Sequence, residues 1–164
     1  MSPSMQFDSS TLRGALGRFT TGVTITTCRD DAGQPVGLTA NSFNALSLDP
    51  PLVLWSLRSV SPSVAAFQAA SHFAVNVLAE AQVALSRRFA SSAAGRFSEG
   101  VWSTGLGGAP VLAGCTAVFE CALESHQAAG DHVLFIGRVL ALHESALPPL
   151  VFQAGHYRLL GEIL

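Results

Sequence analysis

The stretch of sequence that decides the fold is residues 37–57, GLTANSFNALSLDPPLVLWSL. It is apolar enough to lie in the core of a sheet, yet four polar side chains stand close together in it: Thr39, Asn41, Ser42 and Asn44. A buried polar group costs free energy unless it finds a hydrogen-bond partner. The cluster therefore predicts either a turn whose polar groups satisfy one another or a concave site for a polar ligand.

The composition predicts one domain with an apolar surface that another subunit covers. We assign residues 1–164 to one domain, with residues 1–9 as a flexible N-terminus. Only 12% of the residues are charged and the mean hydropathy is +0.40, whereas charged residues make up about a quarter of a typical soluble domain. A homodimer interface would account for this excess of apolar residues. A monomer with an unusually large core is the alternative.

The charge balance and the cysteines exclude several classes of protein. The net charge is −2 without a basic cluster, so we expect no nucleic-acid partner. No apolar run reaches the length of a membrane span, and the start MSPSMQFDSS lacks the pattern of a secretory signal. We therefore expect a cytoplasmic protein without a membrane segment. Cys115 and Cys121 are expected on one strand, about 20 Å apart, too far for a bridge; with Cys28 they are interpreted as buried thiols.

Short runs of β-branched and aromatic residues, separated by turn residues, predict strands. A turn rich in Asp, Gly and Pro at 29–35 is expected to close the first hairpin. Pro50 and Pro51 precede a continuous apolar run that is typical of a buried strand. The expected strands are residues 20–28, 36–39, 52–57, 73–78, 116–127 and 132–143.

Few helices are expected. Ser9 or Ser10 should cap the first, whose apolar positions recur at helical spacing as far as Phe19. Ser61 followed by Pro62 is a start signal for a second helix. The remaining elements are helices at 61–70 and 80–94 and a glycine-rich loop at 100–114. Many strands, few helices and no alternation between them predict a mainly β fold, a closed antiparallel barrel with peripheral helices.

Six segments in this order resemble a known family, the short-chain flavin reductases with the flavin-reductase-like FMN-binding split barrel. The resemblance covers about residues 12–161. The segments are RFTTGVTITT (18–27), GLTANSF with DPPLVLWSL (37–43, 49–57), FAVNVL (73–78), RRFA with RF (87–90, 96–97), GDHVLFIGRV (130–139) and GHY (155–157).

The resemblance implies a homodimeric enzyme with a closed antiparallel split β-barrel and the flavin near the subunit interface. Such an enzyme transfers hydride from NADH or NADPH to FMN or FAD. It then supplies reduced flavin to a partner monooxygenase component. We therefore expect flavin and a nicotinamide dinucleotide as ligands, and no metal.

The resemblance also assigns residues to the site. His132 is expected near the flavin, where the nicotinamide stacks, as the catalytic residue. Residues 58–63 would receive the phosphate at a helix N-terminus, with Arg58 adding charge. Arg88 and Phe89 would reach the phosphate or the adenylate half of FAD. The expected cofactor contacts are Thr39, Ala40, Asn41, Ser42, Phe43, Ser56, Leu57, Ser59, Ser61, Ser63, Phe73, Ala74, Val75, Asn76, Arg88, Phe89 and Tyr157.

Each assignment has a structural alternative. Asn76 in an apolar strand can be a satisfied core amide, and the arginines of residues 87–88 can belong to a solvated helix face. A histidine at the end of a strand often serves structure alone. The glycine-rich run at 105–108 lacks the strand and helix of a dinucleotide fingerprint, and no metal-ligand spacing or nucleophile elbow is present. A non-catalytic flavin-binding protein and an enzyme resembling pyridoxamine phosphate oxidase remain as alternative functions.

Overall fold

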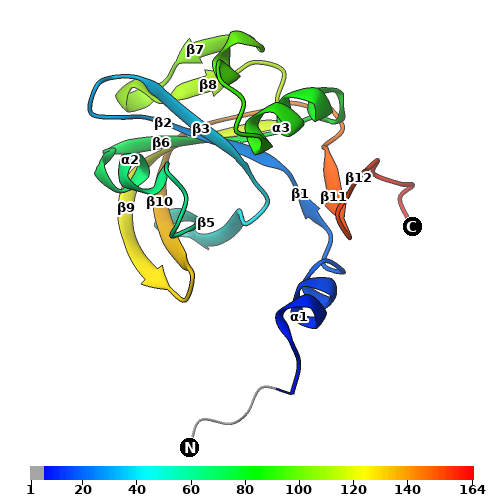
Figure 1. Ribbon diagram of the computed structural model, residues 1–164. Helices are drawn as coiled ribbons and strands as arrows, with labels where there is room; N and C mark the ends of the chain where they lie inside the picture. Colours follow the sequence, from blue (N-terminus) through cyan, green and yellow to red (C-terminus); the bar gives the residue numbers. More distant parts are fainter. Residues whose placement is uncertain (1–5) are drawn as a thin grey trace, which may run out of the picture.

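The computed structural model describes residues 6–164, and its main element is a seven-stranded antiparallel sheet (Figure 1). The strand order is β3-β2-β6-β9-β10-β5-β4. The fold is mainly β with few helices, as predicted. Among the described residues no ladder joins the edge strands β3 and β4, so closure of the barrel stays a prediction. The strands are β2 (Thr24–Arg29), β3 (Pro35–Ala40), β4 (Asn44–Leu48), β5 (Pro51–Arg58), β6 (His72–Val77), β9 (Ala117–Ala129) and β10 (His132–Glu144).

The first hairpin forms where its turn residues predict it. The Asp30 carboxylate accepts hydrogen bonds from the backbone N–H groups of Ala32 and Gln34, at 2.9 and 2.8 Å. Gly33 takes a positive φ of 76° in this turn, a conformation that glycine adopts without strain. The hairpin sets β3 against β2 and so brings the polar end of β3 to one end of the sheet.

The core lies on both sides of this sheet in two clusters. One is built around Trp55, whose ring stacks on Phe135 and meets the edge of Phe67, both at 4.8 Å between ring centroids. The other contains Ile25 and Phe89. Three threonines of β2 are buried with them, and Thr24 and Thr27 donate to backbone carbonyls at 2.7 and 2.6 Å. These bonds remove the cost of burying hydroxyl groups among apolar side chains.

The helices α1 (Ser9–Leu16), α2 (Val64–Ala69) and α3 (Val83–Ala90) are shorter than predicted. Asp8, not Ser9 or Ser10, caps α1, because its carboxylate accepts from the N–H of Thr11 at 2.7 Å. No residue of α1 is buried, and the helix stands away from the sheet (Figure 1). Ser9 is the first residue of α1, and residues 1–5 lie outside the described part of the chain, so the flexibility of residues 1–9 stays a prediction.

Several local predictions were wrong. The glycine-rich loop contains a hairpin of β7 (Trp102–Thr104) and β8 (Pro110–Leu112), and β4 was not predicted. Cys115 precedes β9 and does not share a strand with Cys121, although all three thiols are free and buried. The expected strand 20–28 is divided into β1 (Thr21–Gly22) and β2. β1 pairs with β11 (Val151–Gln153), which pairs with β12 (His156–Arg158).

Across residues 6–164, no helix is long and apolar enough to cross a membrane.

Candidate functional site

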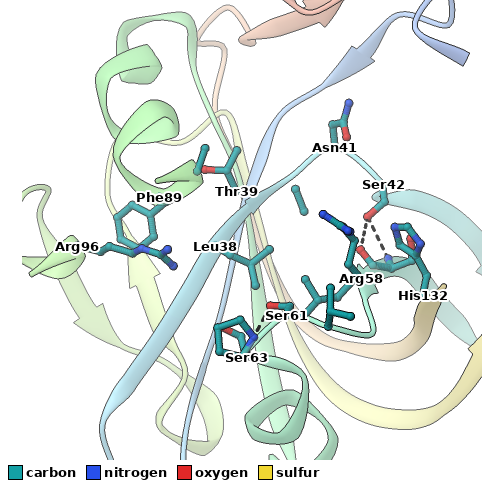
Figure 2. A pocket seen from close by; sticks show the side chains of 16 residues that line it. Leu38, Thr39, Asn41, Ser42, Arg58, Ser61, Ser63, Phe89, Arg96 and His132 are labelled. Atoms are coloured by element: carbon teal, nitrogen blue, oxygen red, sulfur yellow. Dashed lines mark hydrogen bonds between the residues drawn. The ribbon is translucent and has the colours of Figure 1, made fainter. Parts of the chain in front are cut away.

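A cavity of about 580 Å³ opens between the ends of β3 and β5, the turn before α2, the end of α3 and the start of β10 (Figure 2). It gathers residues that are far apart in the sequence. Ten of the predicted site residues line it: Thr39, Ala40, Asn41, Ser42, Ser56, Leu57, Ser61, Ser63, Phe89 and His132.

The polar segment after β3 is both a satisfied turn and a cavity wall. The Ser42 hydroxyl donates to the carbonyl of Ser56 at 2.8 Å and accepts from its N–H at 3.0 Å. This pair of bonds ties the segment to β5. The Thr39 hydroxyl donates to the Ser86 carbonyl of α3 at 2.6 Å, while Asn41 is exposed at the cavity edge. The satisfied turn is therefore confirmed for Thr39 and Ser42, and the place of the segment in a cavity wall is compatible with the ligand site, which stays a prediction.

The serine-rich turn before α2 differs from the prediction. The helix begins at Val64, and Ser63 at its N-cap makes no side-chain capping bond. Ser61 instead uses its hydroxyl to accept from the N–H of Ser63 at 3.3 Å. The two serines line the cavity from this turn. Ser59 does not line it. The Ser59 N–H donates to the Asp131 carbonyl at 2.9 Å.

Positive charge collects in the cavity. Arg58 and Arg96 line it, and within the described part of the chain no aspartate or glutamate does. Arg96 donates to the carbonyl of Gly37 at 2.8 Å and to that of Ser91. A partly enclosed site whose lining contains arginines and no carboxylate favours an anionic ligand. Arg58 was predicted from the sequence and Arg96 was not. Nothing in the spacing of Arg96 and Phe97 indicates that this arginine reaches β3.

His132 stands on the side of the cavity opposite Arg96 (Figure 2). Its Nδ1 lies 2.7 Å from a carboxylate oxygen of Asp131, and 38% of its side chain is exposed. This hydrogen bond, followed by the charge of the ring, lowers the pKa of the Asp131 carboxyl. When Nδ1 donates to the carboxylate, Nε2 is the ring nitrogen left to meet a ligand.

Four predicted contacts on β6 are not in the cavity lining. Phe73 is 2% exposed, and Ala74, Val75 and Asn76 are fully buried, so almost none of their surface is open to a ligand in this chain. The Asn76 amide donates to the Ile25 carbonyl and accepts from the Leu112 N–H, both at 2.9 Å. The geometry therefore supports the structural alternative, a satisfied core amide.

Three further predicted residues act as neighbours of the site. Phe43 stacks on Phe119 with 5.5 Å between ring centroids and is outside the cavity lining. Arg88 points to the turn that carries Arg96 and donates to the Arg96 carbonyl at 3.1 Å. The Tyr157 hydroxyl bonds to that of Ser86 at 2.7 Å, and the tyrosine lines a smaller cavity of about 150 Å³ that shares Thr39 and Asn41 with the larger one.

The chemistry of the cavity suits a flat, partly apolar molecule that carries an anionic group. Leu38 and Val60 offer apolar surface, and the hydroxyl groups and arginines offer hydrogen-bond donors. A comparison with known families decides the identification. The family described as the flavin reductase like domain matches residues 16–161. The chain belongs to this family.

Relatives of this flavin reductase like domain include the FMN reductase (NADH) of Agrobacterium fabrum, which is 44% identical over 92% of this chain and 85% of its own length. The reductase subunit of a flavin-dependent monooxygenase of Rhodococcus jostii is 44% identical over 92% and 77%. The chain spans about half the length of another relative that it matches, 49% of a protein of Rhizobium meliloti.

The fold agrees with solved structures. The NADH:FAD oxidoreductase of Streptomyces globisporus C-1027, solved with NAD and FAD fragments, superposes with a TM-score of 0.89 at 36% identity. The match covers 94% of this chain and 93% of that one. The resemblance inferred from six short motifs is thus confirmed over residues 16–161.

Proposed function

We propose that this protein is an NAD(P)H:flavin oxidoreductase that reduces FMN or FAD and supplies the reduced flavin to a separate monooxygenase component. The observation that carries the proposal is the layout of one cavity, with His132 at one end and Arg96 near the serine turn at the other. Family membership supports the activity, and the name of the Rhodococcus relative supports the kind of partner.

The residues of the cavity fit a flavin in three parts. The apolar side chains suit the ring system, and the segment from Thr39 to Ser42 suits its polar edge and the ribityl hydroxyls. Ser61 and Ser63, with Arg58 and Arg96 beside them, would hold the phosphate. The flavin, when bound, supplies the redox chemistry, since its ring accepts hydride from the nicotinamide.

In this reaction the protein would orient the nicotinamide and the flavin and exclude water from between them. Stacking two rings at a fixed distance replaces a bimolecular encounter by a positioned one. His132 would form a hydrogen bond through Nε2 with the nicotinamide carboxamide, with Asp131 holding the ring by its other nitrogen. Arg88 and Tyr157 would support this arrangement through Arg96 and Ser86. We also infer that the sheet closes into a split barrel, supported by the bonds that draw Ser42 against β5.

We propose a homodimer, supported by apolar side chains that the single chain leaves uncovered. Leu16 of α1 is 65% exposed, Phe19 78% and Leu48 of β4 97%. A second copy that packs on α1 and β4 would remove these groups from water. Light scattering should give twice the chain mass at micromolar concentration; a stable monomer would exclude the dimer. The three free thiols are in keeping with the cytoplasm as its compartment.

One experiment tests the activity. NADH and NADPH oxidation should be followed with riboflavin, FMN and FAD as acceptors in turn. Turnover that depends on added flavin supports the oxidoreductase. Flavin binding without turnover would instead identify the non-catalytic flavin-binding protein, and oxidation of pyridoxamine phosphate would identify the second alternative.

A further inference from the structure

Ser86 of α3 lies behind the wall of the larger cavity and was not among the residues expected at the site. It is fully buried, although serine is usually exposed. Its backbone carbonyl accepts a hydrogen bond from the Thr39 hydroxyl at 2.6 Å, and its own hydroxyl lies 2.7 Å from that of Tyr157. Ser86 thus joins a residue of the cavity wall to the hairpin formed by β11 and β12.

The cavity has one wall on β3 and another on α3, so the distance between these two elements sets its width. Thr39 and Ala40 line it from the end of β3, and Ala90 lines it from the end of α3. The strand is fixed in the sheet, because β3 pairs with β2 from Pro35 to Ala40. The helix has no ladder to hold it, so its packing and its side-chain bonds decide where it lies.

Packing alone does not hold this part of the wall. Thr39 and Ala90 line the smaller cavity of about 150 Å³ as well as the larger one, and Tyr157 lines the smaller one from the far side. Close packing fixes the position of most side chains in a protein interior. Here open space stands on two sides of the wall, so hydrogen bonds must supply part of that restraint.

The ring of Tyr157 is held independently of its hydroxyl. The Arg87 guanidinium lies over the ring, 5.4 Å from its centroid, and Phe152 meets the ring edge to face at 5.4 Å. Phe152 and Tyr157 are also partners across the ladder of β11 and β12. The hairpin therefore sets the place of the Tyr157 hydroxyl, and removal of the hydroxyl should leave the ring where it is.

We propose that Ser86 is a positioning residue for the flavin, which fixes the distance between α3 and β3 through its two bonds to Thr39 and Tyr157. The inference rests on the proposed function, which places the edge of the flavin ring and the ribityl chain against Thr39. A wall that is set before the ligand arrives needs no ordering during binding, and this raises affinity. The phosphate would be held from a different element, the turn of Ser61 and Ser63, so the link should act on the rest of the flavin.

Three variants separate positioning from stability. Tyr157→Phe leaves the buried Ser86 hydroxyl without this partner, Ser86→Ala removes the other half of the bond, and the double variant removes both. A buried hydroxyl that loses its partner destabilises a protein, whereas removal of both partners can be nearly neutral. Thr116→Val is the control, because it deletes a hydroxyl that donates to the Leu147 carbonyl at 2.7 Å, at a position outside the cavity lining.

Dissociation constants for riboflavin and FMN are measured by fluorescence quenching, with a melting curve for each ligand-free variant. We expect both constants to rise about fivefold in Tyr157→Phe and in Ser86→Ala, the equivalent of one hydrogen bond. The double variant should show the same rise and no more, since the two hydroxyls make a single bond. Its melting temperature should lie above that of Tyr157→Phe, while its flavin affinity stays weakened.

A flavin affinity that recovers together with the melting temperature in the double variant would overturn the proposal and leave Ser86 a purely structural role. Unchanged dissociation constants in the single variants would overturn it as well, and so would a loss confined to FMN. An equal loss in Thr116→Val would trace the effect to general destabilisation and have the same consequence.

These binding constants do not depend on turnover. Weakened flavin binding in the variants of a protein that oxidises no NADH would refute the proposed function and leave the positioning role standing. Normal flavin-dependent NADH oxidation with unchanged constants in the variants would do the reverse. Absence of flavin binding to the unmodified protein would overturn both.

Discussion

The segment of residues 39–42 and the strand segment 73–76 each contain an asparagine beside apolar residues, and both were predicted to contact flavin. In the structure they differ completely. Asn41 is exposed at the edge of the cavity, whereas Asn76 is fully buried with its amide bonded on both sides. What distinguishes the two is where their hydrogen bonds go: an amide that the fold satisfies internally has little left for a ligand.

The largest effect, on the free energy of unfolding, should come from replacing each of the two asparagines by alanine in a separate variant. Asn76→Ala removes the side-chain bonds to the Ile25 carbonyl and to the buried Leu112 N–H, at a cost of about 1 to 3 kcal/mol in the free energy of unfolding. Asn41→Ala, at an exposed position, should change it by less than about 0.5 kcal/mol and weaken flavin binding. Urea denaturation and flavin titration of both variants test this. Weakened flavin affinity in the folded fraction of Asn76→Ala would return the strand to the site.

The next effect concerns His132. His132→Ala should leave flavin affinity nearly intact and lower kcat/KM for NADH about five- to a hundredfold, the equivalent of roughly 1 to 3 kcal/mol for one positioning hydrogen bond. His143→Ala, at an exposed position near the other end of β10, is the control. Unaltered NADH kinetics, with or without a lower melting temperature, would remove His132 from the site.

A smaller effect is expected at the serine turn. Ser63→Asp places a negative charge where the phosphate is proposed to lie, so FMN affinity should fall about tenfold while riboflavin affinity changes little. The difference between the two ligands is the measurement, since riboflavin lacks the phosphate. If both weaken equally, the turn contributes shape alone and the phosphate lies elsewhere.

The smallest effect probes the buried region around β6. Burial raises the pKa of the Cys28 and Cys121 thiols to about 12 and that of Cys115 to about 11, from an ordinary 9.0. Below pH 9 the thiols are neutral in both states and the full stability is present. Above it the unfolded thiols ionise first, so stability should fall as the pH rises toward 11 to 12. Urea melts across this range test the sign, and rapid reaction of a thiol reagent with the native protein at pH 8 would contradict the burial.

Most of the sheet could be predicted because its strands are marked by local chemistry. Runs of Thr, Val and Ile, and the turn at Asp30 and Gly33, indicated β2, β3, β5, β6 and the β9–β10 ribbon. The strand β4 was missed because its residues are mostly exposed and show no apolar alternation. The end of α3 was misplaced because Ser91 already has an extended backbone and its hydroxyl donates to the Arg88 carbonyl at 2.7 Å, which no glycine or proline marks in the sequence.

The cavity was predicted in part, for a related reason. The wall that follows β3 is one continuous segment, residues 39–42, and the resemblance assigned this segment to the flavin site directly. Arg96 reaches Gly37 across 59 positions of sequence, and no local pattern announces such a contact. Conversely, the flavin contacts expected on β6 came from the resemblance alone. The sequence did not show that β6 is buried between β2 and β9.

The hydrogen bond from the Ser59 N–H to the Asp131 carbonyl has a consequence for how the chain can vary. It joins the loop that bears the serines to the tip of the β9–β10 hairpin, one residue from His132, where β5 and β10 pair Arg58 with His132. Adding or deleting a residue at either place would slide one side of the cavity past the other. Natural variants of this chain should therefore tolerate new side chains here far better than changes in length.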